Sequence, residues 1–299
     1  MRCLVTGGAG FIGSNLTIEL EKRGNEVMVV DSLLTGNKDN LKGFNGKFIN
    51  ADISKEEELK KIPDNLEAVF HEAAITDPRF KDDKEMLRAN IEGFKNMIAL
   101  AKKNKAKLVY ASTANLYGNG PVPMKESQKK DIITVYGKSK LMMDNIAEKY
   151  SDNMHIVGLR YFNVFGPKEA SKGRSASMIY HLAKQMKANK RPRIFKWGQQ
   201  KRDHIYVKDA VRATLLALKA KSGIYNVGTG IGTSFNELIK ALNDVLKTNY
   251  QPEYFDSPYD TQTYQVNTQA DTTKSKEFLN FECKYSLKEG IKEYVEMIE

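Results

Sequence analysis

Three evenly spaced glycines near the start of the chain constrain its fold most. Gly7, Gly10 and Gly13 follow one another at intervals of three residues. An expected strand, Cys3–Val5, precedes them, and an expected helix, Ile12–Glu21, follows. In this setting one glycine makes a tight turn, one lets the backbone approach a pyrophosphate, and one lets the helix pack on the strand. An ordinary strand-to-helix turn also accommodates glycine, but the strand expected before the glycines and the helix expected after them favour a dinucleotide site.

Two acidic residues extend this prediction. Asp31 lies 18 positions after Gly13, at the end of the second expected strand, where it can accept hydrogen bonds from an adenosine ribose. The negative charge of Asp31 favours NAD because it would repel the 2′-phosphate of NADP. The cation Lys38 lies nearby in the sequence, so NADP remains a candidate cofactor. Asp52 follows the third expected strand, where it either meets the adenine edge or caps the segment that begins at Ser54. The sequence leaves these two roles open.

The next part of the chain alternates short apolar runs with amphipathic segments. Further strands are expected at Glu26–Val30, Lys47–Asn50, Ala68–His71, Lys107–Ala111 and His155–Leu159, and further helices at Lys55–Lys61, Lys84–Lys103 and Tyr136–Tyr150. Such alternation predicts an α/β fold of the Rossmann type, a doubly wound parallel sheet with helices on both faces.

The alternation loosens after about residue 166. Expected elements there are helix Ser177–Asn189, strands Ile194–Phe195, Ile205–Tyr206 and Ile224–Val227, helices Val207–Lys219 and Phe235–Leu246, and a closing helix from Leu287. We expect residues 1–165 to form the NAD(P)-binding domain, with 205–228 returning to it. Residues 166–204 and 229–299 are expected to form a smaller, interleaved substrate lobe.

Composition excludes several classes of protein. The 299 residues are 41% hydrophobic, which excludes general disorder, and they include only 2 cysteines, so a cytoplasmic protein without a disulfide framework is expected. No export signal, membrane span or metal site is expected. The formal net charge is +10, but no nucleic-acid-binding signature accompanies it, so most lysines are interpreted as solvated surface.

A tyrosine and a lysine at helical spacing are candidate catalytic groups. Tyr136 and Lys140 lie four residues apart, on one face of the expected helix. An ammonium and a cationic nicotinamide beside the phenol would lower its pKa, so that a phenolate could take a hydroxyl proton while hydride leaves the same carbon. Upstream, Thr113 or Ser112 at a strand end offers a hydroxyl to hold the substrate oxygen.

Together these motifs resemble those of the extended short-chain dehydrogenase/reductases, in particular the nucleotide-sugar epimerases. The resemblance covers essentially the whole chain. Besides the features above, it rests on His71–Ala74, Arg160–Pro167, Arg202–Val207 and Tyr225–Gly230. Three later segments look more like ADP-glyceromanno-heptose 6-epimerases than UDP-hexose 4-epimerases: Lys172–Met178, Gln199–His204 and Tyr264–Asp271.

The resemblance implies specific roles for the catalytic and substrate residues. Tyr136 would be the base and Lys140 its electrostatic partner and ribose ligand. Thr113 would orient the sugar, and Lys172 would be a second acid or base on the opposite face of the sugar. The implied substrate contacts are Ser112, Thr113, Asn163, Arg202 and Tyr264, with Asn163 and Arg202 at the diphosphate.

The resemblance also implies a tightly bound NAD, with NADP possible. The implied cofactor contacts are Gly7, Gly10, Phe11, Ile12, Gly13, Asp31, Ser32, Lys38, Asp52, Ile53, Ala73, Ala74, Asn90, Tyr136, Lys140 and Phe162. The family commonly pairs through its long helices, here Lys84–Lys103 and Tyr136–Tyr150, so a homodimer is expected.

Two departures from the family pattern narrow the function. Ala114 and Asn115 stand where the related dehydratases have an acidic pair, which disfavours water elimination. Thr263 replaces an arginine usual in the heptose epimerases. We therefore expect an NAD(P)-dependent nucleotide-sugar epimerase that inverts one sugar carbon, similar to the ADP-heptose 6-epimerases. The alternatives are a UDP-glucose/galactose 4-epimerase, a nucleotide-keto-sugar reductase and an NAD(P)-sensing binding protein.

Overall fold

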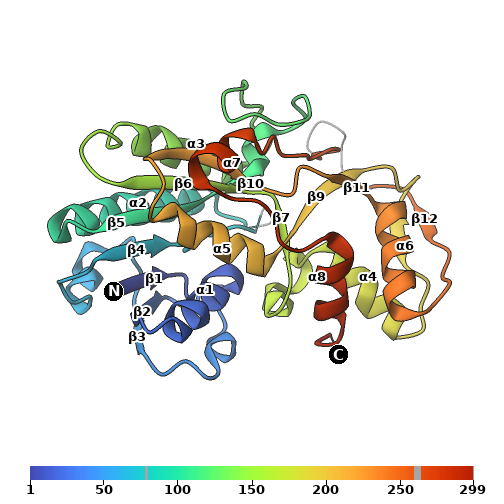
Figure 1. The fold of residues 1–299 in the computed structure, drawn as a ribbon, viewed down its shortest axis with the longest axis horizontal. Coiled ribbons are helices and arrows are strands. Elements are labelled where there is room, and N and C mark those ends of the chain that lie inside the picture. Colours follow the sequence, from blue (N-terminus) through green and yellow to red (C-terminus); the bar gives the residue numbers. More distant parts are fainter. Residues whose placement is uncertain (78–79, 259–263, 299) are drawn as a thin grey trace.

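Seven parallel strands form the central sheet of the protein (Figure 1). A computed structural model describes residues 1–77, 80–258 and 264–298, so the predicted departure at Thr263 lies outside the described residues. The strands are β1 (Arg2–Thr6), β2 (Glu26–Asp31), β3 (Lys47–Asn50), β4 (Ala68–His71), β5 (Lys107–Thr113), β6 (Ile156–Tyr161) and β10 (Gly223–Val227). The predicted doubly wound parallel sheet is confirmed.

The order of the strands fixes where a ligand can bind. Across the sheet the order is β10-β6-β5-β4-β1-β2-β3, so the chain adds strands on one side of β1 and then on the other. The direction of winding reverses between β1 and β4. In open α/β sheets the crevice at this reversal, at the carboxyl ends of the strands, is where ligands bind. The glycine loop after β1 lies at this point.

Helices cover both faces of the sheet. One face carries α1 (Phe11–Lys22) and α5 (Val207–Ala217), which contact each other, and the other carries α2 (Asp83–Asn104) and α3 (Val135–Glu148). Two apolar clusters fill the spaces, one beneath each helix pair. The N-cap of α3 is Thr134, whose hydroxyl accepts a hydrogen bond from the Gly137 amide at 3.0 Å. This cap fixes the start of the first helical turn, which contains Tyr136.

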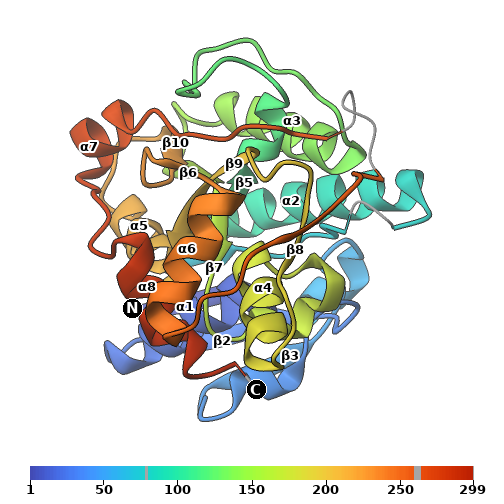
Figure 2. The same cartoon turned by 90° about the vertical axis from the view of Figure 1, so that its right-hand side faces the viewer.

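The second lobe holds two small sheets (Figure 2). One contains β7 (Asn163–Phe165), β9 (Lys201–Tyr206) and β11 (Gly232–Ser234), and the other contains β8 (Arg193–Phe195) and β12 (Glu253–Phe255). The remaining elements are α4 (Met178–Lys187), α6 (Phe235–Leu246), α7 (Thr273–Leu279), α8 (Leu287–Val295), η1 (Lys38–Leu41), η2 (Glu56–Lys61), η3 (Ala114–Tyr117) and η4 (Glu169–Ser175), where η marks a 3-10 helix.

The strand expected at residues 205–206 is part of β9 and pairs with β7, which lies within residues 1–165. Two segments differ from the sequence prediction. The expected helix at Lys55–Lys61 is the 3-10 helix η2, in which Leu59 packs against the core but no residue is fully buried, so little apolar contact stabilises an α-helix. α7, expected in the substrate lobe, packs on β10, where Lys274 donates to the Ile224 carbonyl at 2.8 Å.

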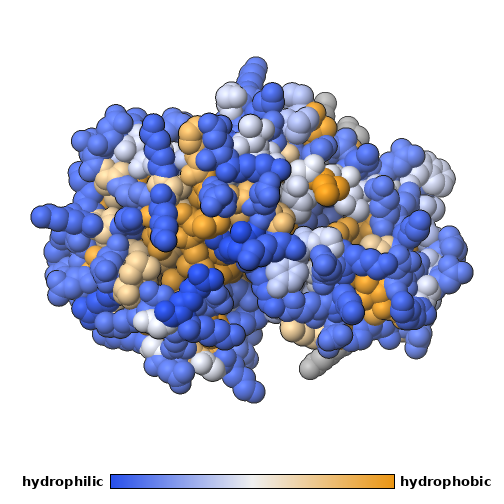
Figure 3. All heavy atoms as spheres, in the orientation of Figure 1, coloured by the Kyte–Doolittle hydropathy of each residue, from blue (hydrophilic) through white to orange (hydrophobic). Residues whose placement is uncertain are grey.

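The surface agrees with the lysine-rich composition. In the view of Figure 3, hydrophilic side chains cover most of the molecule, with apolar area limited to patches. Within the described ranges, every helix is too short or too polar to span a bilayer.

Candidate functional site at the carboxyl edge of the sheet

The glycine loop after β1 is closed tightly enough to exclude side chains. Gly7 has a φ of +67°, and a Cβ placed on it would lie 2.6 Å from the Ala73 amide nitrogen. A Cβ on Gly13 would lie 2.2 Å from the Gly7 carbonyl oxygen. α1 begins after Gly10 without a side-chain cap, so its first amides, including those of Phe11 and Ile12, remain available to an anion.

The carboxylate of Asp31 lies beside this loop. Its two oxygens accept hydrogen bonds from the Ala9 amide at 2.9 Å and the Leu33 amide at 2.8 Å. Burial raises the pKa of Asp31, and each carboxylate oxygen retains a lone pair for a further donor. Ser32 and Lys38 are exposed, and the Lys38 ammonium lies 5.1 Å from the centre of the Phe48 ring.

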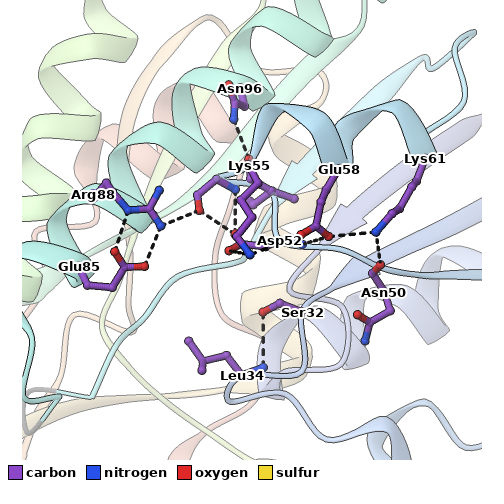
Figure 4. Close-up of polar contacts among 12 residues, drawn as sticks. Ser32, Leu34, Asn50, Asp52, Lys55, Glu58, Lys61, Glu85, Arg88 and Asn96 are labelled. Carbon is purple, nitrogen blue, oxygen red and sulfur yellow. Dashed lines mark hydrogen bonds and ion pairs between the residues drawn. The ribbon is translucent and has the colours of Figure 1, made fainter.

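The Asp52 carboxylate closes a turn with Ser54, whereas η2 itself begins without a side-chain cap (Figure 4). Its Oδ1 accepts from the Ser54 amide at 2.9 Å and from the Ser54 hydroxyl at 2.7 Å. Its other oxygen lies 3.8 Å from the Lys55 ammonium, and Arg88 reaches over to donate to Ser54. The neighbouring Ile53 side chain is buried. The structure thus uses Asp52 to close the turn after β3.

The predicted catalytic residues come together where α3 meets the end of β5. The Tyr136 hydroxyl is hydrogen-bonded to the Thr113 side chain. Lys140 is only 1% exposed, donates to the Ala111 carbonyl at 2.7 Å, and lies 5.9 Å from the centre of the Tyr136 ring. The structure therefore brings a phenol, a hydroxyl and an ammonium together at the carboxyl edge of the sheet.

Burial shifts the ionisation of this group. Loss of hydration lowers the pKa of Lys140 to about 8, opposed by the carboxylates of Glu72 and Asp144. Loss of hydration also raises the pKa of Tyr136 to about 12, a shift that the Thr113 hydrogen bond opposes and the Glu72 charge increases. At neutral pH Lys140 is charged and Tyr136 is protonated until another positive charge enters the site.

Other predicted cofactor and substrate contacts fall into two groups. Ser112 is buried, and its hydroxyl has no partner among the described residues, so it is available to a ligand. Ala73 contacts the glycine loop, and Ala74 follows it, half-buried. By contrast, the Asn90 amide is engaged by the Ile75 backbone and Ser139, so it ties the segment after β4 to α3. The Phe162 ring is buried and packs against Tyr117.

The predicted diphosphate contacts lie where the second lobe meets the main sheet. The Asn163 amide donates to Thr268 at 2.9 Å, and the Arg202 guanidinium donates to the Val266 carbonyl at 2.7 Å. Arg202 also lies 5.1 Å from the centre of the Tyr264 ring, and burial lowers the pKa of the guanidinium. These contacts hold Arg202 at the inner surface of the second lobe.

Lys172 lies beside the first residue of α1. It belongs to η4, and its ammonium is 5.6 Å from the centre of the Phe11 ring at the start of α1. No direct contact joins it to Tyr136 or Thr113 within the described residues. Lys172 therefore approaches the crevice from the side of α1.

One residue of the site had no role in the sequence prediction. Glu72 directly follows β4, and its carboxylate lies 3.2 Å from the Tyr161 hydroxyl. Loss of hydration raises the pKa of Glu72 to about 7, opposed by the Lys140 charge. An acidic residue directly after a buried apolar strand is the same signal that identified Asp31, and it could have identified Glu72.

Comparison with known proteins agrees with this geometry. The model of the NAD dependent epimerase/dehydratase family matches residues 3–228. The chain is similar to ADP-L-glycero-D-manno-heptose-6-epimerase of Brachyspira hyodysenteriae, with 38% identity over 99% of this chain and 97% of the relative.

Two solved structures have the same fold throughout. Helicobacter pylori ADP-L-glycero-D-manno-heptose-6-epimerase has a TM-score of 0.94 and 36% identity, over 99% of this chain and 96% of that one. Thermotoga maritima UDP-glucose 4-epimerase, solved with UDP-glucose, has a TM-score of 0.91 and 33% identity, over 99% and 98%. The chain belongs to the NAD-dependent epimerase/dehydratase family.

Proposed function

We propose that this protein is an epimerase of an ADP-linked heptose that inverts carbon 6 of the sugar. The observation that carries the proposal is the group formed by Thr113, Tyr136 and Lys140 at the carboxyl edge of the parallel sheet. Near-full-length similarity to two heptose epimerases supports the choice of substrate.

The residues of this group have complementary tasks in such a reaction. Tyr136 removes the proton of the substrate hydroxyl, and the Thr113 hydroxyl holds the oxygen in place. Lys140 stabilises the phenolate because its ammonium is fixed beside the ring by the Ala111 carbonyl. NAD held by the glycine loop and Asp31 would supply a hydride acceptor that can also act as a hydride donor. The reaction is therefore redox-neutral overall.

The glycine loop fits a dinucleotide. Gly7 and Gly13 leave a cradle that any Cβ would fill, and the uncapped start of α1 presents amides to a pyrophosphate. Asp31 would accept from the adenosine ribose, and its charge favours NAD over NADP. Lys38, exposed near the end of β2, is the residue that would admit NADP. We propose a tightly bound NAD that is regenerated in every turnover.

The substrate would lie between the two lobes. Arg202 and Asn163 would hold the diphosphate, a role that suits a guanidinium already fixed by backbone carbonyls. Ser112 offers an unpartnered hydroxyl to the sugar. Lys172 would act as the second acid or base, which requires its ammonium to turn from Phe11 toward the sugar.

An activity panel tests the proposal. The protein is incubated separately with ADP-heptose, UDP-glucose and UDP-galactose, and products are identified by NMR. We expect inversion at carbon 6 of the heptose without net consumption of NAD. Steady oxidation of NADH or NADPH on a keto sugar, with no epimer, would instead identify a reductase.

A UDP-hexose 4-epimerase is the second candidate. It is favoured by the full-length similarity to the Thermotoga maritima enzyme, which was solved with UDP-glucose. Interconversion of UDP-glucose and UDP-galactose, without a reaction on ADP-heptose, would establish it. In either case Ala114 and Asn115 leave no acidic pair after Thr113 to eliminate water.

The proposal also covers the cellular compartment and the oligomeric state of the protein. Cys3 and Cys283 are both free, which suits a reducing compartment such as the cytoplasm. We propose a homodimer formed through α2 and α3, which lie against each other on one face of the sheet. Neither nucleic acid nor a membrane is a proposed partner.

A further inference from the structure

The backbone of Glu72 lies directly against the glycine loop. A Cβ on Gly7 would come within 2.9 Å of the Glu72 carbonyl carbon, so the glycine turn rests directly on this residue. The Glu72 amide donates to the Thr6 carbonyl at 3.1 Å, which fixes its backbone at the end of β1. A half-buried carboxyl is thus held between the glycine loop and the Tyr136–Lys140 helix.

A chain of hydroxyl groups leads away from this carboxyl. The Tyr161 hydroxyl at the end of β6 lies 3.2 Å from Glu72 Oε1 and 2.6 Å from the Thr214 hydroxyl on α5. The Thr214 hydroxyl in turn lies 2.8 Å from the Ala210 carbonyl oxygen. Each hydroxyl has one proton to donate, so an ionised Glu72 requires one direction of the chain and a protonated Glu72 permits the reverse.

Both directions are fully hydrogen-bonded. When Glu72 is ionised, Thr214 donates to Tyr161, and Tyr161 donates to the carboxylate. When Glu72 is protonated, it donates to Tyr161, Tyr161 donates to Thr214, and Thr214 donates to the Ala210 carbonyl. The two states differ by one proton, which Glu72 exchanges with solvent. The carboxyl therefore stays in place in both states without leaving a buried hydroxyl unsatisfied.

We propose that Glu72 is a positioning residue of the epimerase, because its charge sets the protonation of Lys140 and Tyr136. The Tyr161–Thr214 hydroxyl chain can reverse its direction, so it accommodates both the ionised and the protonated form of Glu72. The groups that face it are Lys140 and Tyr136 from α3, Tyr161 from β6 and Thr214 from α5. An ionised Glu72 favours the Lys140 ammonium and disfavours the Tyr136 phenolate.

An infrared titration of the full-length protein without substrate tests the ionisation directly. We expect the carbonyl stretch of one protonated carboxyl to disappear near neutral pH, to be missing in Glu72→Gln, and to remain in the control Glu26→Gln. Glu26 is the first residue of β2, at the amino ends of the parallel strands, where it forms an ion pair with Arg2. An identical titration in Glu72→Gln and the wild type would overturn the proposal.

Thr214→Val tests the hydroxyl chain. In this variant a protonated Glu72 can donate to Tyr161 only by leaving the Tyr161 hydroxyl without an acceptor among the described residues, whereas an ionised Glu72 still accepts its proton. Since an unsatisfied buried donor is unfavourable, the carboxyl should titrate at lower pH than in the wild type. An unchanged midpoint would contradict the reversible chain. Neither infrared result depends on turnover, so both remain informative if the proposed function fails.

The kinetic test rests on the proposed function. Removing the Glu72 charge destabilises the Lys140 ammonium, so the alkaline limb of the kcat profile should move to lower pH in Glu72→Gln, with KM little changed. In Thr214→Val the alkaline limb of the kcat profile should stay at the same pH, because Glu72 is ionised throughout the pH range of that limb. A uniform loss of kcat at every pH in Glu72→Gln would indicate a purely structural role.

Discussion

At the scale of single residues, burial decides what the catalytic side chains can do. Lys140 and Tyr136 lie four residues apart on one face of a helix, but their altered pKa values arise from burial and from neighbouring charges. A buried ammonium is retained only because carboxylates and a carbonyl face it. Their reactivity is therefore a property of the folded site.

Tyr136→Phe should reduce kcat by about 10²–10⁴-fold, since it removes the group that takes the substrate proton. Binding of NAD, measured by calorimetry, should change little because the ring and Lys140 remain. The control is Tyr250→Phe, a tyrosine whose hydroxyl lies near Asn189 at the surface of the second lobe. If the wild type shows no turnover and Tyr136→Phe leaves the function of the protein unchanged, an NAD(P)-sensing binding protein would be favoured instead.

The pH dependence of the reaction should show the altered Lys140. Its pKa is lowered to about 8, so the ammonium should lose its proton above that pH, and kcat/KM should fall. The same shift means that the folded state binds fewer protons than the unfolded chain between about pH 8 and the ordinary lysine pKa. Stability should therefore rise with pH in that window, as measured by denaturant unfolding. A kcat/KM that stays constant well above pH 8 would exclude this assignment.

At the scale of elements, a buried ion pair fixes the catalytic helix to the sheet. Asp144 lies one turn after Lys140 on α3 and pairs with Arg160 of β6 at 2.9 Å, with exposed side-chain fractions of 1% and 4%. Tyr110 of β5 donates to the same carboxylate at 3.0 Å, so three elements meet at one group. This junction sets how far α3 can move relative to the end of β5.

Asp144→Ala should destabilise the protein by about 3–5 kcal/mol because it leaves the Arg160 charge buried without its partner. The matched control is Glu92→Ala on α2, whose pair with Lys95 is exposed and should contribute at most about 0.5 kcal/mol. Urea unfolding measures both. Equal losses in the two variants would show that the Asp144 pair does not anchor α3.

At the scale of the whole molecule, the winding of the sheet and the second lobe together enclose the site. The chain leaves the main sheet after β6, returns as β10, and places β7 and β9 between the lobes. Asn163 and Arg202 come from these two strands, so the proposed diphosphate contacts depend on how the lobes are interleaved.

Light scattering tests the proposed assembly of this molecule. We expect the mass of two chains, and we expect Met142→Lys on α3 to shift the protein toward the monomer. Met142 is 40% exposed on the proposed interface helix, whereas Met297, 57% exposed near the end of the chain, provides the control Met297→Lys. A monomer in the wild type, or an equal effect of both variants, would remove the proposed interface.

Local sequence patterns were enough to predict the features that depend on short spacing. The glycine loop, Asp31 at a strand end and the Tyr136–Lys140 pair are all local patterns, because a turn or a helix face is completed within a few residues. The alternation of strands and helices similarly predicted the parallel sheet. The 3-10 form of η2 was not predicted, and the sequence left two roles open for Asp52, since each depends on contacts that compete with local preference.

Which distant residues share the site depends on how the chain folds. Glu72 and Tyr161 are 89 positions apart, and Tyr161 and Thr214 are 53 apart, so no local pattern joins them. Packing of β4, β6 and α5 brings the three together and removes water from them. Because a carboxyl ionises according to its hydration and the charges facing it, its role in the site arises only once the chain has folded.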